Sequence, residues 1–481
     1  MRSPGILLPT GRERLWGVEL SVTSRTGRAS ISLRNRLLGD AEARTIRADV
    51  MRLAMPSIGE QLLNMTVQMV DTYLMGHISA SALTAVGLSN NMVMLAQTFV
   101  MALATGTTAV VARLIGAREP AAASRVMQQS LLVGVTIGAL LTIAMTVFAG
   151  QAIAFYAPEP DVAVIGTNYL RIVSFSFLMQ GLLWVGNAAL RGAGDTRTPL
   201  YVMLALNATN IVTSVLFLYG FGPLPAVGVY GPAIGTAVSM SIGGLAMLLI
   251  LTRGRANLRI ERGDWLPDRR VILRVTNVGL PAGGEQLALR LGMTMFQRLV
   301  TGLGTVAFAA HSVALTSMSM SFMPGFGFSV AATTMVGQAL GARDPERARR
   351  SVREALRVSS WAMGAAGLLL FVFGGQVMGL FVDDPEVVAL GVAPLQILGL
   401  IQPISAATMV YSGALRGAGD TRWTLLITAL SVWVLRIPLT LSLLGPLGLV
   451  GAWSGMAIDN MMRALLCWLR YRTGRWALTK V

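Results

Sequence analysis

Long apolar runs separated by short polar stretches fill most of the chain. At about 20 residues or more, each run can cross the roughly 30 Å hydrocarbon core of a bilayer as a helix. The runs do not alternate as barrel strands do, and a backbone in lipid must satisfy its own hydrogen bonds, so we predict helices. The predicted twelve spans are residues 51–76, 86–112, 127–150, 163–189, 198–219, 228–252, 276–300, 309–336, 352–374, 388–413, 424–444 and 449–471.

The composition also indicates a membrane protein. Only 13% of the 481 residues are charged and 54% are hydrophobic, whereas a soluble protein carries about 25% charged residues. The formal net charge of +16 lies in the gaps between the apolar runs. That placement argues against a nucleic-acid partner and fits membrane topology. The single cysteine, Cys467, excludes an internal disulfide.

The polar connections form two sets that alternate along the chain, one rich in arginine and one without it. The positive-inside rule places the arginine-rich connections and both termini in the cytoplasm, on the inner side of the cell membrane. The arginine-rich set comprises residues 113–125, 191–197, 253–275, 343–357, 416–422 and the tail from 470; the arginine-free set comprises residues 77–85, 159–161, 220–227, 301–308, 383–386 and 445–448.

A nine-residue stretch, ALRGAGDTR, occurs at residues 189–197 and again at 414–422, an offset of 225. Its glycines permit a tight reversal, and we expect Asp195 and Asp420 to cap the helices that follow. The offset implies an all-α polytopic membrane protein built from two parallel six-helix repeats, which is a transporter architecture. The predicted parts are a basic N-terminal extension 1–50, a first repeat 51–252, a linker 253–275, a second repeat 276–471 and a tail 472–481.

Three further motifs accompany the repeat across residues 51–471: a first span reading LAMPSIGEQLLNMTVQMVDTYLMGH, and the loops GAREP and GARDP. With both LRGAGDT loops, this combination resembles multidrug and toxic compound extrusion (MATE) transporters. The resemblance implies an N-lobe and a C-lobe arranged as a V. It also implies an antiporter that exports amphipathic, often cationic compounds by alternating access. We expect lipid and drug-like molecules as partners, a monomer, and no cofactor other than a coupling ion, H+ or Na+.

Asp71 in the first span is the leading candidate for that coupling site. An ionisable side chain at mid-bilayer costs about 2.5–3.5 kcal/mol, so its presence suggests a function. Asn64 and Gln68 precede it on the same helix face. In MATE transporters, the matching aspartate is the principal cation site of the N-lobe. Pro56 removes a helical hydrogen bond in the same span, and the resemblance implies that the helix bends there.

The resemblance also implies partners for Asp71 on the fifth and sixth spans. These correspond to Asn210, Ser214 and Thr236, with Asn207 as an additional amide. Ser214 stands where the family carries an acid or amide, so fewer negative charges face a cation. This favours proton coupling and leaves sodium coupling open.

The second repeat keeps the proline but carries Phe296 at the position of Asp71. Its remaining intramembrane charges form a candidate C-lobe charge network of Arg436, Asp459, Glu285 and Arg290. We expect Asp459 to pair with Arg463 one turn later or with Arg436, and the alternative is a proton or substrate role.

Two acids near the cytoplasmic ends of the spans, Glu60 and Glu285, are expected to pair with basic loops. Candidate substrate or cavity residues are Gln68, Asn64, Asn207, Met179 and Met320, because amides and flexible thioethers suit promiscuous binding.

Two alternatives to a multidrug exporter remain open. A flippase for a lipid-linked precursor belongs to the wider superfamily, but such proteins usually have additional helices and a strongly cationic cavity. A membrane-embedded enzyme is the other alternative. The sequence contains no HExxH zinc motif, no GxSxG elbow and no nucleotide-binding loop, so we expect no catalytic residues and no metal site.

Overall fold

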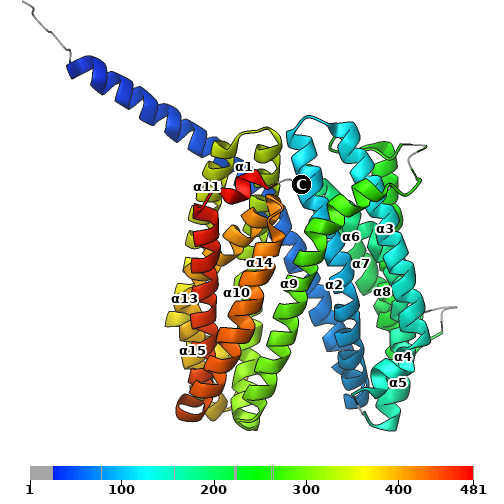
Figure 1. Ribbon diagram of the computed structural model, residues 1–481. Coiled ribbons are helices and arrows are strands. Elements are labelled where there is room, and N and C mark those ends of the chain that lie inside the picture. Colours follow the sequence, from blue (N-terminus) through cyan, green and yellow to red (C-terminus); the bar gives the residue numbers. More distant parts are fainter. Residues whose placement is uncertain are drawn as a thin grey trace, which may run out of the picture. The chain divides into compact units, whose positions relative to one another are not determined.

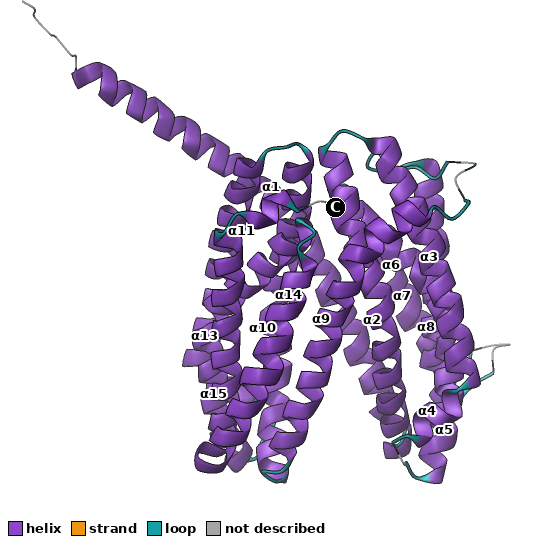
Figure 2. Cartoon of the chain, viewed as in Figure 1, coloured by secondary structure: helices purple, strands orange, loops and turns teal. Residues whose placement is uncertain are grey.

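The computed structural model describes residues 25–76, 78–156, 158–221, 225–261, 263 and 265–479, and these are mostly helical (Figure 2). In these ranges it has one isolated bridge, between Arg255 and Leu258, and no extended strand, which confirms the all-α prediction. The helices are α1 (Arg25–Gly76), α2 (Ala80–Gly116), α3 (Pro120–Val147), α4 (Ala149–Ala154), α5 (Pro160–Ser174), α6 (Ser176–Gly192), α7 (Arg197–Tyr219), η1 (Gly228–Tyr230), α8 (Gly231–Arg253), α9 (Arg269–Thr301), α10 (Thr305–Gly341), α11 (Pro345–Val372), α12 (Gly374–Gly379), α13 (Pro385–Gly417), α14 (Thr421–Leu430), η2 (Ser431–Arg436), α15 (Ile437–Arg472) and η3 (Arg475–Leu478).

All the predicted spans fall on these helices, although the boundaries differ. In the described part of the chain, 8 helices are long and apolar enough to cross a membrane, or 9 if α5 and α6, bent by 48°, form one span. The last of them, Thr421–Arg472, covers two predicted spans. Gly448 interrupts its backbone with φ 56° and ψ −134°. The chain is therefore a multi-pass membrane protein, and the number twelve stays a prediction.

Helix α1 begins at Arg25, well before the first predicted span, so residue 50 is not an element boundary. Residues 1–24 of the predicted extension lie outside the described residues. Ile46, Val50 and Leu53 lie at helical spacing and are buried in one cluster with residues of α10, α11 and α13. The charged residues between them lower the average hydropathy, which is why the sequence pattern missed this part of the helix.

The helices from α2 onward pack in two groups (Figure 1). In the first group, which we call the N-lobe, α3 packs on α6 and α7 packs on α8. In the second, the C-lobe, α13 packs on α10, α11 and α15. A buried cluster that includes Met127, Leu183 and Met247 fills the N-lobe. The linker is fixed to the same lobe, because Gln129 Oε1 on α3 accepts a hydrogen bond from the backbone N–H of Asp268 at 2.9 Å.

The lobes meet where α2 crosses α9 and α10, in a seam of close backbone contact. A Cβ atom on Gly116 would lie 1.9 Å from the carbonyl oxygen of Gln338, and one on Gly341 would lie 1.9 Å from that of Arg113. Gly116 and Gly341 are related by the 225-residue offset, so the repeat generates a symmetric crossing. Gln338 Nε2 also donates to the carbonyl of Gly192 at 3.0 Å, which joins the seam to the repeated loop.

Each copy of the repeated loop connects to the first span of its own repeat through an ion pair. Arg191 NH1 lies 3.0 Å from Glu60 Oε1, and Arg416 NH2 lies 2.8 Å from Glu285 Oε1. These contacts confirm the expected pairing of both glutamates with basic loops. Because both glutamates are buried, each arginine provides a charge partner that the helix interior lacks.

The two loop aspartates differ. Asp195 accepts hydrogen bonds from the backbone N–H of Thr198 at 3.0 Å and from its hydroxyl at 2.7 Å, which confirms the predicted cap of α7. Asp420 makes no capping hydrogen bond to α14, so its predicted cap is wrong. Its Oδ2 instead accepts from Arg470 Nε at 2.8 Å. The second copy has Trp423 in place of Thr198, which removes the hydroxyl that orients the first aspartate.

Candidate functional site

The predicted coupling residue Asp71 lies near the end of α1, in the half remote from the repeated loops. Its Oδ1 atom is buried and has no hydrogen-bond partner among the described residues. Leu74 and Met75, one turn further along α1, belong to a buried cluster that also contains Tyr169, Leu218 and Ala233 from α5, α7 and α8. Asp71 therefore enters the apolar interior of the N-lobe from α1.

The fifth- and sixth-span candidates meet where α7 crosses α8. Asn210 Nδ2 donates to Thr236 Oγ1 at 3.3 Å and to Ser239 Oγ at 3.4 Å. A Cβ atom on Gly235 would lie 2.2 Å from Ser214 Oγ, so glycine allows α8 to approach Ser214 closely. The structure thus brings Asn210, Ser214 and Thr236 together at one helix crossing, and their role as partners of Asp71 stays a prediction.

Helix periodicity places Asp71 and the residues of the α7–α8 crossing on the helix faces that form the buried cluster of Leu74, Leu218 and Ala233. Residues three or four apart share a helix face. Asp71 shares a face of α1 with the clustered Leu74, Ser214 shares a face of α7 with Leu218, and Thr236 shares a face of α8 with Ala233. The three polar side chains therefore lie one turn from residues that contact one another.

The polar atoms in this region are incompletely satisfied. Within the described residues, Asn207 Nδ2, Asn210 Oδ1 and Ser214 Oγ are buried and lack hydrogen-bond partners, as does Asp71 Oδ1. A buried polar atom without a partner costs about 1–3 kcal/mol. Three of these four atoms are oxygens, which can accept a hydrogen bond or coordinate a hard cation, and the Asp71 carboxylate can also take up a proton. The arrangement suits reversible cation binding better than structural support.

Two residues of this region were not predicted from the sequence. Tyr169 on α5 is buried within electrostatic range of Asp71, and Ser239 on α8 receives the second hydrogen bond of Asn210. The spacing of Ser239, three residues after Thr236 on the same helix face, was a usable signal. Tyr169 offered none, because its proximity to Asp71 depends on how α5 packs against α1.

The remaining N-lobe candidates are more dispersed. Pro56 lies inside α1, where it removes a backbone donor without ending the helix. Asn64 Nδ2 donates to Gln61 Oε1 at 3.3 Å, and Gln68 is exposed. Met179 is half-buried at the packing of α6 on Gly244 of α8.

Met320 lies on α10 of the C-lobe and is 49% exposed. The five cavity candidates thus occupy α1, α6, α7 and α10. Their role in substrate binding stays a prediction.

In the C-lobe, the position equivalent to Asp71 is aromatic. Phe296 is fully buried, and its ring centroid lies 5.5 Å from that of His311. The His311 ring in turn lies 5.8 Å from that of Trp453. Large rings thus occupy the region that holds small polar side chains in the N-lobe. The two lobes have the same helices but different chemistry here.

The C-lobe charges form one triad rather than the predicted network of four. Asp459 Oδ2 accepts from Arg436 Nε at 2.8 Å and from Arg463 NH2 at 2.9 Å, so both expected pairings are present. Glu285 pairs with Arg416 instead, and no contact among the described residues joins Arg290 to Asp459. Arg436 ends the π-helical turn η2, whose first residue, Ser431, also hydrogen-bonds Asp459. The triad fits a structural interpretation, and a transport role for it stays a prediction.

Comparison with known proteins identifies the family. The MatE family model matches twice, over residues 56–216 and 281–441, again offset by 225 residues. The chain is 31% identical over 448 residues to the probable multidrug resistance protein NorM of Thermotoga maritima, covering 92% of this chain and 96% of the relative. It is 28% identical over 442 residues to the multidrug resistance protein MdtK of Yersinia pseudotuberculosis, covering 90% and 95%. A crystal structure of a mutant of the Vibrio cholerae MATE transporter VcmN shares the fold, with a TM-score of 0.85, 20% identity and coverage of 90% and 98%. The chain therefore belongs to the MatE family and is a multi-pass protein of the cell membrane.

Proposed function

We propose that this protein is a secondary-active antiporter that exports amphipathic, cationic drug-like compounds in exchange for protons. Family membership and the names of the relatives NorM and MdtK, both multidrug resistance proteins, support efflux. Those relatives are named as drug-resistance proteins rather than as enzymes, which argues against a membrane-embedded enzyme. Among the described residues, Arg436 is the one arginine that is almost fully buried, and it pairs with Asp459, which argues against the strongly cationic cavity of a flippase.

The observation that carries the proposal is the carboxylate oxygen Oδ1 of Asp71, which is buried near the α7–α8 crossing and has no hydrogen-bond partner in the described part of the chain. A single proton neutralises one carboxylate completely, and the neutral acid is well suited to an apolar surrounding. Sodium binding needs several hard oxygen ligands and gains from a second negative charge. Ser214 offers only a neutral hydroxyl at the position where the family carries an acid or amide. The chemistry of this group supports protons, with sodium as the alternative.

We also propose that the chain crosses the membrane twelve times and that both termini lie in the cytoplasm. The 8 apolar helices become 9 if α5 and α6 form one span. The break at Gly448 divides Thr421–Arg472, already one of these, into two spans and so adds one more. The charged helices α1 and α9 supply the last two. Even numbers of spans in each lobe place all the arginine-rich loops on one side, which the positive-inside rule assigns to the cytoplasm.

The experiment that tests the proposal measures uptake of a fluorescent cationic dye by everted membrane vesicles. Collapsing the proton gradient is expected to stop dye uptake, whereas removing the sodium gradient leaves it unchanged. Asp71→Asn is expected to abolish uptake, because an amide cannot exchange a proton. Asp161→Asn is a matched control, since Asp161 is exposed in the first turn of α5.

Each contrary result points to a different error. Normal uptake by Asp71→Asn would show that the coupling site lies elsewhere. Uptake that follows only the sodium gradient would replace the proton by sodium. Absence of uptake under both gradients, with the protein correctly inserted, would favour the flippase alternative.

A further inference from the structure

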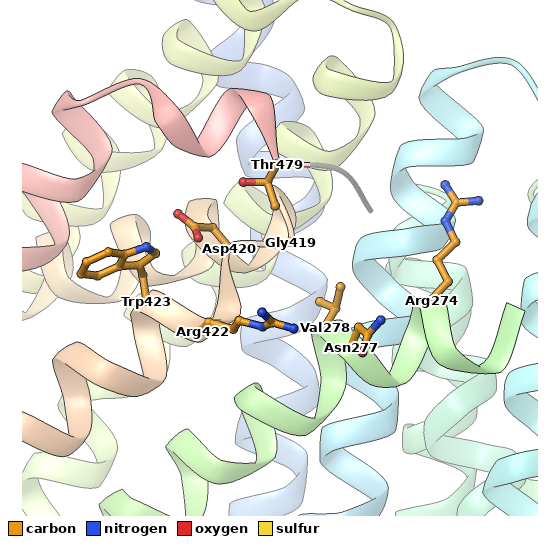
Figure 3. A pocket seen from close by; sticks show the side chains of 8 residues that line it. All are labelled: Arg274, Asn277, Val278, Gly419, Asp420, Arg422, Trp423 and Thr479. Carbon is orange, nitrogen blue, oxygen red and sulfur yellow. The ribbon is translucent and has the colours of Figure 1, made fainter. Parts of the chain in front are cut away.

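A pocket of about 370 Å³ lies beside the second copy of the repeated loop (Figure 3). Three separate segments line it. Helix α9 contributes Arg274 and Asn277, the start of α14 contributes Arg422 and Trp423, and the segment after α15 contributes Thr479. Arg422 extends across the pocket toward α9, as Figure 3 shows. This pocket is remote from Asp71, and the proposed transport mechanism does not use it.

The one acid among the described lining residues, Asp420, already has a cation of its own. Its Oδ2 accepts from Arg470 Nε at 2.8 Å. The Arg470 guanidinium is held in place because it also lies 4.7 Å from the centroid of the Trp423 ring. The charge of Asp420 is therefore compensated by Arg470, which is not one of the two arginines that line the pocket. Arg274 and Arg422 give the pocket a net positive charge.

Arg274 provides the second observation. Its Nε atom is buried and has no hydrogen-bond partner among the described residues. Arg113, within electrostatic range of Arg274, donates from NH1 to the carbonyl of Thr479 at 2.8 Å. These two guanidinium groups thus interact electrostatically, and neither forms an ion pair with a carboxylate of the described residues. Neighbouring cations repel, and an unsatisfied buried donor is costly, so an anion here would relieve both penalties.

We propose that this pocket binds a phosphate group through Arg274 and Arg422. Guanidinium groups match the geometry of phosphate oxygens, and Asn277 supplies an additional amide donor. A phosphate group reaches such a site either as a lipid headgroup or as a free anion. Trp423 is 43% exposed at the pocket, and indole rings favour the level of lipid headgroups. The bound anion would join α9, α14 and the C-terminal segment, and through Thr479 also α2 of the other lobe.

The test measures thermal unfolding of the purified full-length protein in detergent by tryptophan fluorescence. Inorganic phosphate is compared with chloride at equal ionic strength, and short-chain phosphatidylglycerol is compared with short-chain phosphatidylcholine. A ligand that binds only the folded state raises the unfolding temperature, and the rise grows with its affinity and its concentration. We expect phosphate, phosphatidylglycerol or both to raise this temperature. Arg422→Gln is expected to need about tenfold more of the same probe for an equal rise, since it loses a charge-assisted hydrogen bond.

The repeat supplies a matched control. Arg197 occupies the position of Arg422 in the first copy of the loop and is likewise exposed, but it does not line the pocket. Arg197→Gln should respond to the probes as the wild type does. Both arginines are exposed, so neither substitution should prevent folding, and Arg274→Gln provides a second variant.

The probes also separate the two sources of phosphate. A response to phosphatidylglycerol alone identifies a lipid headgroup site, and a response to inorganic phosphate identifies a site for free phosphate groups. The proposal is overturned if neither probe acts beyond its control. It is equally overturned if Arg197→Gln loses as much of the response as Arg422→Gln does.

Discussion

Replacing Gly116 by alanine is expected to separate the two lobes at the seam between α2 and α10. The added Cβ would lie 1.9 Å from the Gln338 carbonyl oxygen, where ordinary contact begins at 3.4 Å. The neighbouring atom is backbone, so no side-chain rotation can relieve the overlap. The helices must therefore move apart by roughly 1.5 Å, which also strains the hydrogen bond from Gln338 to the repeated loop.

Overpacking of this kind costs about 1–3 kcal/mol. The same free energy changes a conformational equilibrium by roughly 5- to 150-fold. If the closed seam belongs to one state of the transport cycle, Gly116→Ala disfavours that state by this factor. We expect a lower unfolding temperature in detergent and slower dye uptake in everted vesicles. Gly341→Ala should behave alike, because its Cβ would lie 1.9 Å from the Arg113 carbonyl oxygen.

Gly87→Ala on the same helix is the control. Apart from the backbone of its own helical turn, no atom of the described residues lies within 4 Å of its added Cβ, and alanine within a helix is favoured over glycine by about 0.5–1 kcal/mol. Gly87→Ala should therefore unfold at the wild-type temperature or above it. If Gly116→Ala matches this control in both assays, α2 and α10 do not approach as closely as the structure shows, and the reasoning fails.

Two further predictions concern charged side chains. Asp459→Asn is expected to destabilise the protein by about 3–5 kcal/mol, because it leaves the buried guanidinium of Arg436 and the partly buried one of Arg463 without a carboxylate. Arg463→Gln, which keeps the pair with Arg436, should lower the unfolding temperature less. Burial raises the pKa of Asp195, but hydrogen bonds from Thr198 and Arg255 outweigh burial and hold that pKa below its usual value. Wild type should therefore be more stable than Asp195→Asn at neutral pH. Thermal unfolding should show this advantage begin to fall at about pH 4, the usual pKa of an aspartate, and disappear below the lowered pKa of folded Asp195. An advantage that persists in stronger acid would contradict the assignment.

The sequence predicts features that depend on local periodicity or on the repeat. Apolar length predicts the helices, and the 225-residue offset predicts that Glu60 and Glu285 share one environment. The sequence does not predict contacts that a residue makes with a distant helix. Asp420 has the sequence context of a helix cap, but Arg470 reaches it from α15, and no local pattern encodes that approach. Tyr169 was missed for the same reason, because its position beside Asp71 depends on helix packing.

The two lobes share one set of contacts and differ in another. The location of the shared and the different contacts bears on the transport mechanism. The contacts that the repeat preserves are the ion pairs of Glu60 and Glu285 with the repeated loops, and the glycine crossing of α2 with α10. These contacts lie at the end of the bundle where the lobes touch. The opposite half has diverged, with Asp71 in one lobe and a buried Phe296 in the other. A rocking transporter needs matched surfaces where its lobes close, but only one lobe needs to bind the coupling ion. We therefore predict that the symmetric end serves closure of the lobes and that ion coupling takes place in the asymmetric half.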